Sequence, residues 1–203
     1  MVDEIFRNPR LAAIYDALDG DRSDLDQYLS LVHEYDARRI LDMGCGTGTF
    51  ALLLADHGRD VIAADPAEVA QAIVSRAEWE AALAGALAAL RPGGRLVFET
   101  RDPDRRAWEE WNRTASSRVM WIDGVGDVES WVELTNLALP MVNFRWTWVF
   151  ADGDVLTSDS TLRFRERPEV ERDLAAAGYV LEDVRDAPDR PGRELVFVAR
   201  RPA

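Results

Sequence analysis

The sequence predicts a doubly wound α/β fold, in which helices cover both faces of a mostly parallel sheet, with an antiparallel β insertion later in the chain. Three observations predict it. Apolar runs alternate with amphipathic stretches, a glycine-rich loop joins one run to a helix, and a later stretch alternates apolar and polar residues. A chain of 203 residues, 47% of them hydrophobic, can bury one core. We therefore expect a single domain over 1–203, with an antiparallel cap over 115–166 within it.

The amino-terminal segment predicts two short helices. Asn8 and Pro9 provide a cap and a proline at the first helical position, and Gly20 ends that helix. Asp24 can cap a second helix, which leads to a strand over Arg39–Met43. We therefore expect two helices before the first strand of the sheet.

The next segment contains two α/β units. After the first strand come the glycine loop, a helix and the short apolar strand Val61–Ala64. Ser75 and Glu78 have the spacing of a capping box and introduce an alanine-rich helix. That helix stops at the Arg-Pro-Gly-Gly stretch of residues 91–94, and residues 96–98 then form a buried strand.

Strand periodicity dominates the second half of the chain. Five apolar residues recur at every second position and share one strand face: Val142, Phe144, Trp146, Trp148 and Phe150. Asp152–Gly153 supplies a hairpin turn. The chain then returns to a helix between Pro168 and Gly178, followed by strands over 179–184 and 194–199.

Composition excludes several classes of function. The net charge of −13 disfavours a nucleic-acid partner, because phosphate backbones are bound by clustered Lys and Arg. The apolar runs are too short for a membrane span, and the amino terminus has no basic region of an export signal. Cys45 is the only cysteine, which leaves no internal disulfide and little from which to build a metal site. We expect a cytoplasmic protein without a metal.

The loop LDMGCGTG at residues 41–48 carries the chemistry. Glycines after a strand permit close backbone approach, and the following helix terminus offers unpaired N–H groups to an anionic or polar cofactor. A dinucleotide-binding loop would need glycine at position 49, where this chain has Thr49. A nicotinamide-dependent oxidoreductase is therefore the rival interpretation.

The spacing Asp42-x-Gly44-x-Gly46-x-Gly48, together with Asp65 after the second strand, resembles the class I S-adenosylmethionine-dependent methyltransferases. The resemblance implies a Rossmann-like fold with S-adenosylmethionine as cofactor. It implies that the backbone of the glycine loop packs against the methionine and ribose portions, and that Asp42 lies beneath the amino-acid moiety. Asp65 would accept both ribose hydroxyls, which suits a group with two acceptor oxygens.

Three further residues are candidates for the cofactor site by the same resemblance. Tyr15 is similar to an amino-terminal tyrosine that covers the cofactor, and Arg22 would pair with the cofactor carboxylate. Cys45 lies inside the loop, where a small residue suffices. Packing or surface roles are the alternative for Tyr15 and Arg22.

The resemblance is to small-molecule enzymes of bacterial type, with antiparallel strands inserted after the fifth strand of the family's sheet to cover the substrate. Glu99 and Arg101 leave a strand at the edge where open α/β sheets bind ligands, so we expect them on the acceptor side. Six tryptophans lie close together in the sequence and predict either an aromatic chamber for a cationic acceptor or a sheet core: Trp108, Trp111, Trp121, Trp131, Trp146 and Trp148. Transfer to a nitrogen or oxygen needs positioning above all, so no residue is assigned as the catalytic base.

The middle of the chain is too short for the family's pattern. Arg91 follows Asp65 by only 26 positions, where the family has a third strand, an adenine-contacting acidic loop and a fourth strand. We therefore predict a break in the chain near Glu68 and Val69. If the chain is continuous, residues 96–98 should pair directly with 40–43, because each strand would otherwise bury an unpaired edge. A non-catalytic relative is the alternative function that a genuine deletion favours.

Overall fold

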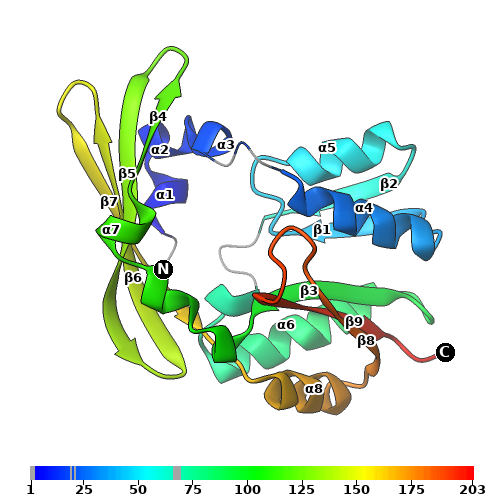
Figure 1. Ribbon diagram of the computed structural model, residues 1–203. Helices are drawn as coiled ribbons and strands as arrows, with labels where there is room; N and C mark the ends of the chain where they lie inside the picture. The colour runs from blue at the N-terminus through cyan, green and yellow to red at the C-terminus, as the bar shows by residue number, and fades with distance from the viewer. Residues whose placement is uncertain (1–2, 19, 21, 66–69) are drawn as a thin grey trace. The chain divides into compact units, whose positions relative to one another are not determined.

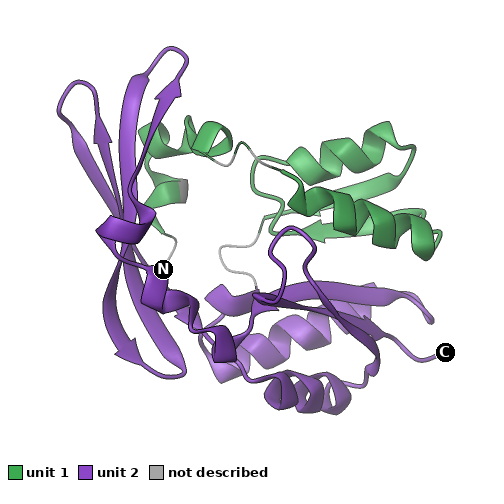
Figure 2. Ribbon diagram, in the orientation of Figure 1, with its two compact units in different colours: residues 1–69 green, residues 70–203 purple. Residues whose placement is uncertain are grey.

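The computed structural model describes residues 3–18, 20, 22–65 and 70–203. The chain divides into two compact units, residues 1–69 and 70–203, which Figure 2 colours separately. The prediction of one domain over 1–203 stays a prediction.

The first unit begins with four helices: α1 (Glu4–Arg7), α2 (Pro9–Ala12), α3 (Tyr15–Leu18) and α4 (Asp24–Glu34). The side chain of Asn8 accepts a hydrogen bond from the backbone of Arg10 at 2.9 Å, which confirms the predicted cap. The single helix expected from there to Gly20 is wrong, because it is divided into the one-turn helices α2 and α3. Four-residue helices leave many end groups to be satisfied elsewhere, and the sequence period does not reveal such a division.

The first unit contains a two-stranded parallel sheet. Strand β1 (Arg39–Met43) pairs with β2 (Asp60–Ala64), with Ile40 opposite Val61. The helix between them, α5 (Thr49–Asp56), follows the glycine loop as predicted. Several apolar side chains of these elements stay exposed: Leu41, Met43, Leu52 and Ile62.

The second unit contains a three-stranded sheet built from strands far apart in the sequence. Its order is β3 (Arg95–Arg101), β9 (Glu194–Arg200) and β8 (Val180–Asp186), and each neighbouring pair is antiparallel. Helices α6 (Arg76–Ala89) and α8 (Arg167–Ala176) pack against it (Figure 1). Their apolar side chains and those of the sheet form one core, whose buried members are Ile73, Trp79, Leu83, Val170, Leu174, Tyr179, Phe197 and Ala199.

Buried polar contacts tie α6 and α8 together. The indole of Trp79 donates a hydrogen bond to Asp173 at 2.9 Å, and Arg76 donates to the other carboxylate oxygen at 2.7 Å. The guanidinium of Arg165 lies 4.2 Å from the centre of the Trp79 ring and donates to the carbonyl oxygens of Ile73 and Ala70. These contacts fix residues 70–73 to the core.

Several sequence signals are confirmed at the ends of these elements. The Ser75 hydroxyl accepts a hydrogen bond from the backbone of Glu78, so the predicted cap of α6 is present. At Gly94 a Cβ atom would lie 2.9 Å from the carbonyl oxygen of Arg91, so this turn requires glycine. Gly178 follows α8 with a φ of +95°, the left-handed conformation typical of a helix C-terminus.

The second unit also contains a four-stranded antiparallel sheet, the expected strand-rich segment. Its strands follow chain order: β4 (Arg118–Ile122), β5 (Gly126–Ala138), β6 (Met141–Phe150) and β7 (Val155–Arg163). The turn at Asp152–Gly153 joins β6 to β7 as predicted. Short helical segments precede the sheet: η1 (Ala70–Ala72), η2 (Pro103–Arg105), η3 (Ala107–Glu110) and α7 (Arg113–Ser116).

Within each of the two units, the described strands do not form the predicted mostly parallel sheet. The described strands make three separate sheets, of which only β1–β2 is parallel. The alternative expectation, that residues 96–98 pair with 40–43, concerns strands of different units and stays a prediction.

The physical reason is the short middle segment. Over residues 70–94 the structure contains only η1 and α6, so the absence of the family's third and fourth strands from this stretch is confirmed. A stretch without these strands adds no parallel neighbour to β1 and β2. The predicted break near Glu68 and Val69 lies outside the described residues.

Candidate functional site

The glycine loop between β1 and α5 has a backbone that requires glycine. Gly44, Gly46 and Gly48 have φ angles of +83°, +51° and +86°, where an L side chain is strained. The N–H of Gly44 donates to the carbonyl oxygen of Ala64 at 2.7 Å, which attaches the loop to the end of β2. The spacing seen in the sequence therefore corresponds to a fixed backbone shape.

A side-chain contact joins this loop to the amino-terminal helices. The hydroxyl of Thr47 donates to the carboxylate of Asp16 in α3 at 2.7 Å and lies 3.2 Å from the hydroxyl of Thr49. Gly48 is the N-cap of α5, and the N–H of Leu52 donates to its carbonyl oxygen. The loop thus leads directly into a helix N-terminus, whose dipole favours negative charge.

Two carboxylates stand at the carboxyl ends of the parallel strands. Asp42 lies opposite Ala63 in the sheet register, and Asp65 directly follows β2. One oxygen of Asp42, Oδ2, is buried and has no hydrogen-bond partner among the described residues. Burial, and after it the negative charge of Asp65, raises the pKa of Asp42. The pair therefore offers acceptor oxygens toward a ligand with hydroxyl or ammonium donors.

The coupling between these two carboxyl groups can be tested without a ligand. Replacing Asp65 with Asn removes a negative charge while keeping the shape of the side chain. The pKa of Asp42 should then fall toward its ordinary value, since only burial still raises it. Carboxyl carbon NMR across an acid titration measures this change. An unchanged Asp42 titration would contradict the placement of the two groups.

The other predicted cofactor residues lie in the same unit. Tyr15 begins α3 and is half-buried. The guanidinium of Arg22 donates to Asp24 at 3.4 Å, and the ion pair is about 30% exposed. Cys45 is a free, half-buried cysteine in the loop. Their contact with a cofactor stays a prediction.

In the second unit, Glu99 and Arg101 at the end of β3 belong to a charged group that includes residues the sequence reasoning missed. Arg101 lies opposite Glu194 of β9, with their closest side-chain atoms 3.9 Å apart. Arg190 forms ion pairs with Glu194 at 2.8 Å and with Glu99 at 3.3 Å. Arg101 also donates to the amide oxygen of Gln71 at 3.5 Å.

Glu194 has an unusual environment in this group. Its side chain is 4% exposed, and its Oε2 atom has no hydrogen-bond partner among the described residues. Burial, and after it the negative charge of Glu99, raises the pKa of Glu194 to about 7 against the opposing effect of Arg190 and Arg101. In the sequence, the signal for Glu194 is that a charged residue begins an otherwise apolar strand.

The six tryptophans occur in several separate contacts. Trp108 packs edge to face on Phe164 at 4.8 Å between ring centroids and is 5% exposed. Trp146 and Trp148 stack on one strand face at 5.9 Å, and Trp148 is 2% exposed. Trp111 packs against Phe144. The burial of Trp108 and Trp148 favours the sheet-core alternative for these two residues.

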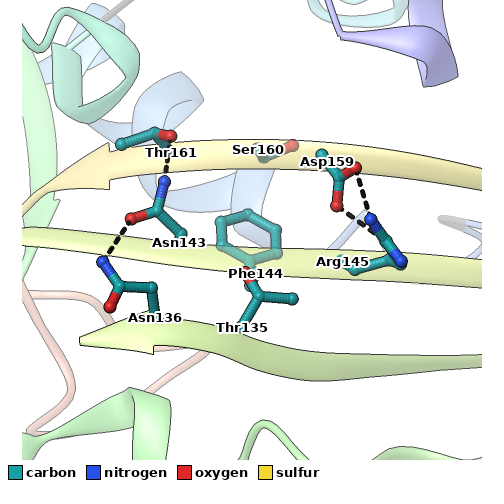
Figure 3. Close-up of a pocket in the computed structure, with 8 residues that line it drawn as sticks. All are labelled: Thr135, Asn136, Asn143, Phe144, Arg145, Asp159, Ser160 and Thr161. Atoms are coloured by element: carbon teal, nitrogen blue, oxygen red, sulfur yellow. Dashed lines mark hydrogen bonds and ion pairs between the residues drawn. The ribbon is translucent and has the colours of Figure 1, made fainter.

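A shallow hollow lies on the antiparallel sheet across β5, β6 and β7 (Figure 3). Its volume is about 440 Å³. Arg145 and Asp159 form a two-point ion pair at 2.7 and 2.8 Å, and Asn143 donates to Thr161 at 2.6 Å. These polar side chains bond mainly to one another across the strands.

Within residues 3–18, 20, 22–65 and 70–203, no group of three His, Cys, Asp or Glu side chains is arranged to hold a metal ion. In the same ranges no helix is both long and apolar enough to cross a membrane.

Comparison with known proteins identifies the fold. Residues 21–79 match the methyltransferase domain family, a stretch that includes the glycine loop and Asp65. No curated protein matches the sequence. The solved structure of Streptomyces venezuelae DesVI has a TM-score of 0.73 at 20% identity, covering 95% of this chain and 98% of that one.

Two further structures are similar. CalS10 from Micromonospora echinaspora, an amino pentose methyltransferase solved with S-adenosylmethionine bound, has a TM-score of 0.61 at 21% identity, covering 93% of this chain and 96% of that one. KedS8 from Streptoalloteichus, a sugar N-methyltransferase, has a TM-score of 0.66 at 18% identity, covering 93% of each chain. The shared fold is Rossmann-like α/β. Residues 21–79 thus match the methyltransferase domain family, within a fold that is similar to those of S-adenosylmethionine-dependent methyltransferases.

Proposed function

We propose that this protein transfers the methyl group of S-adenosylmethionine to a nitrogen or oxygen atom of a small molecule. The observation that carries the proposal is the geometry of the glycine loop, with Asp42 and Asp65 at the ends of the two strands beside it. The residues present fit the cofactor, because a buried acceptor oxygen of Asp42 has no partner among the described residues.

Each group has a role that follows from its chemistry. Asp42 would accept from the ammonium of the methionine moiety, and Asp65 would accept from both ribose hydroxyls. The backbone of Gly44, Gly46 and Gly48 would lie against the cofactor, since no Cβ atom keeps it at a distance. When bound, the cofactor supplies an electrophilic methyl group on a sulfonium.

Tyr15 and Arg22 would complete this site. Tyr15 would cover the cofactor, and Arg22 would exchange its weak pairing with Asp24 for the cofactor carboxylate. Breaking the pair with Asp24 costs little free energy, because a partly exposed ion pair contributes little to stability. Cys45 contributes backbone only.

The acceptor side is assigned to the second unit. The antiparallel strands would act as a cap over 115–166, inserted after the family's fifth strand, with Glu99, Arg101 and Trp146 facing the acceptor. Trp108 and Trp148 would belong to the core beneath the cap. The similarity to CalS10, an amino pentose methyltransferase, and to KedS8, a sugar N-methyltransferase, supports a small-molecule acceptor. We propose no nucleic-acid or membrane partner, and a cytoplasmic location.

Two rival functions predict different results. A nicotinamide-dependent oxidoreductase is disfavoured by Thr49, which stands where a dinucleotide loop has its third glycine. A non-catalytic relative is favoured by the absence of strands from residues 70–94. It would bind the cofactor without transferring a methyl group.

Calorimetry with S-adenosylhomocysteine tests the proposal. We expect saturable binding of S-adenosylhomocysteine and no binding of NADH at the same concentration. A screen of small amines and phenols with labelled S-adenosylmethionine then measures transfer. Binding of NADH would select the oxidoreductase, and binding without transfer to any acceptor would select the non-catalytic relative. Absence of S-adenosylhomocysteine binding at millimolar concentration would overturn the proposal.

A further inference from the structure

The charged group at the carboxyl end of β3 has more acidic than basic members. Three carboxyl groups face two guanidinium groups: Glu99, Asp189 and Glu194 with Arg101 and Arg190. All five belong to the second unit, three of them on β3 and β9 and two on the loop that precedes β9 (Figure 1). If every carboxyl group is ionised, one negative charge is left without a matching cation in this group. A buried excess charge is costly, so the group favours either a proton or an added cation.

Glu99 and Glu194 can share that proton. On the common face of β3 and β9 they are diagonal neighbours, since Glu99 lies opposite Val196 and Glu194 lies opposite Arg101. Arg190 contacts both carboxyl groups, which holds them close to each other. The negative charge of Glu99, so placed, helps burial to raise the pKa of Glu194, so Glu194 is the group that holds the proton.

The two carboxyl groups differ in accessibility. The side chain of Glu99 is 30% exposed, whereas that of Glu194 is 4% exposed. A ligand can therefore reach Glu99 from solvent, with Glu194 behind it. Glu194 would act on a ligand only through Glu99 and the arginines.

An amide beside this group points to a ligand independently. Gln71 is 8% exposed, and its amide oxygen accepts from Arg101, which orients the side chain into the group. Its amide nitrogen is buried and has no hydrogen-bond partner among the described residues. A buried donor without an acceptor is unfavourable, and an oxygen atom of a ligand would satisfy it.

We propose that this group is the recognition site for a methyl acceptor that carries an amine next to an oxygen atom. Glu99 contacts the ammonium and accepts its proton, Glu194 is a positioning residue that shares this proton, and Gln71 donates to the neighbouring oxygen. The inference rests on the proposed function and narrows its acceptor from a nitrogen or oxygen nucleophile to an amine.

Methyl transfer to the amine conserves protons and electrons. The ammonium transfers one proton to the carboxylate of Glu99, leaving a neutral amine with a lone pair. That pair forms the new N–C bond while the methyl–sulfur bond breaks, and its electrons stay on sulfur as the thioether of S-adenosylhomocysteine. The product is an N-methylammonium ion, and the proton on the carboxyl pair passes to solvent before the next turnover.

An alcohol or phenol suits this group less well. A carboxylate is too weak a base to deprotonate an alkyl alcohol, and a phenolate would add negative charge where carboxylates are already in excess. An ammonium ion instead supplies the missing cation. Trp111, whose ring lies 5.8 Å from the guanidinium of Arg101, borders the group with an aromatic surface.

The first measurement is carboxyl carbon NMR of the full chain, titrated with and without 2-aminocyclohexanol as the amine probe and 1,2-cyclohexanediol as the neutral control. We expect Glu194 to titrate with a pKa of about 7, raised by burial and by the negative charge of Glu99. The amine should lower this pKa, because it favours the ionised pair, and the diol should leave it unchanged. Titration of Glu194 near the ordinary pKa of a glutamate, or equal effects of amine and diol on its pKa, would overturn the inference.

The second measurement uses variants and the amine binding affinity. E99Q should weaken amine binding at least tenfold, and wild-type affinity should rise between pH 6 and pH 8, a rise that E194Q abolishes. E182Q is the matched control, because Glu182 also pairs with two arginines, Arg95 and Arg200, on the same sheet. Amine affinity that is unchanged in E99Q, or a pH dependence retained in E194Q, would contradict the assignment.

Calorimetry with S-adenosylhomocysteine on the same samples separates the two proposals. Its binding should be the same in wild type, E99Q and E182Q. Loss of that binding in wild type would overturn the proposed function and leave the carboxyl titration as a separate result. Methyl transfer to the diol but not to the amine would keep the proposed function and overturn this inference.

Discussion

Replacing Asp65 with alanine should weaken S-adenosylhomocysteine binding by roughly 10- to 150-fold, which corresponds to about 1.5–3 kcal/mol for hydrogen bonds to a charged group. The carboxylate follows β2 directly and is exposed, so a ribose could reach both of its oxygens. The substitution removes no packing contact in the core. Calorimetry of the variant and of wild type at one pH gives the ratio of dissociation constants.

Asp60 provides the matched control. It begins the same strand, is largely exposed, and its side chain forms a long ion pair with Arg39 at 3.8 Å. D60A should bind S-adenosylhomocysteine within about twofold of wild type. The substitution removes a surface ion pair, and such pairs contribute little to stability. Equal affinity of D65A and D60A would remove Asp65 from the cofactor site.

Replacing Arg165 with alanine should lower the free energy of unfolding by about 3 kcal/mol, the scale for losing a buried hydrogen-bonded cation and the contacts of its side chain. The side chain is 1% exposed, donates to Ile73 and Ala70, and covers the face of Trp79. Burial lowers the pKa of Arg165 to about 10, which leaves it charged at neutral pH. Urea unfolding followed by tryptophan fluorescence measures the loss.

The neighbouring Arg167 tests whether charge alone is responsible. Its side chain is 54% exposed and pairs with Glu171 one helical turn away. R167A should change the free energy of unfolding by less than about 0.5 kcal/mol, as expected for an exposed pair on a helix. R165K should recover only part of the loss, because an ammonium group cannot donate to two carbonyls and stack on the ring as a guanidinium does. Equal stability of R165A and R167A would show that the buried contacts contribute nothing.

Local signals in the sequence were sufficient for much of the fold. The glycines at 44, 46 and 48 require left-handed backbone, so their spacing identifies the loop without any knowledge of its neighbours. The cap at Ser75 and the turn at Asp152–Gly153 are likewise set by residues a few positions apart. Each of these features depends on interactions within one turn.

The failures concern interactions between distant parts of the chain. The mostly parallel sheet was expected from the family's pattern, yet strand pairing depends on which edges are available, and β3 pairs with β9 about a hundred positions later. Glu194 and Arg190 were missed for the same reason, because a lone charged residue beside a strand has no meaning until Glu99 and Arg101 are placed against it. Gln71 gave no signal in the sequence at all.

The two-stranded sheet of the first unit also affects how the protein behaves in solution. Leu41, Met43 and Ile62 on its strands are 43%, 44% and 63% exposed. Association of two copies of the chain through these side chains would bury apolar surface and is therefore favourable. A net charge of −13 opposes such collisions through long-range repulsion. This repulsion extends roughly 30 Å in 0.01 M salt and about 8 Å in 0.15 M salt. The colloidal stability of the purified protein therefore depends on ionic strength, and dilute buffer is the medium in which its molecules stay apart.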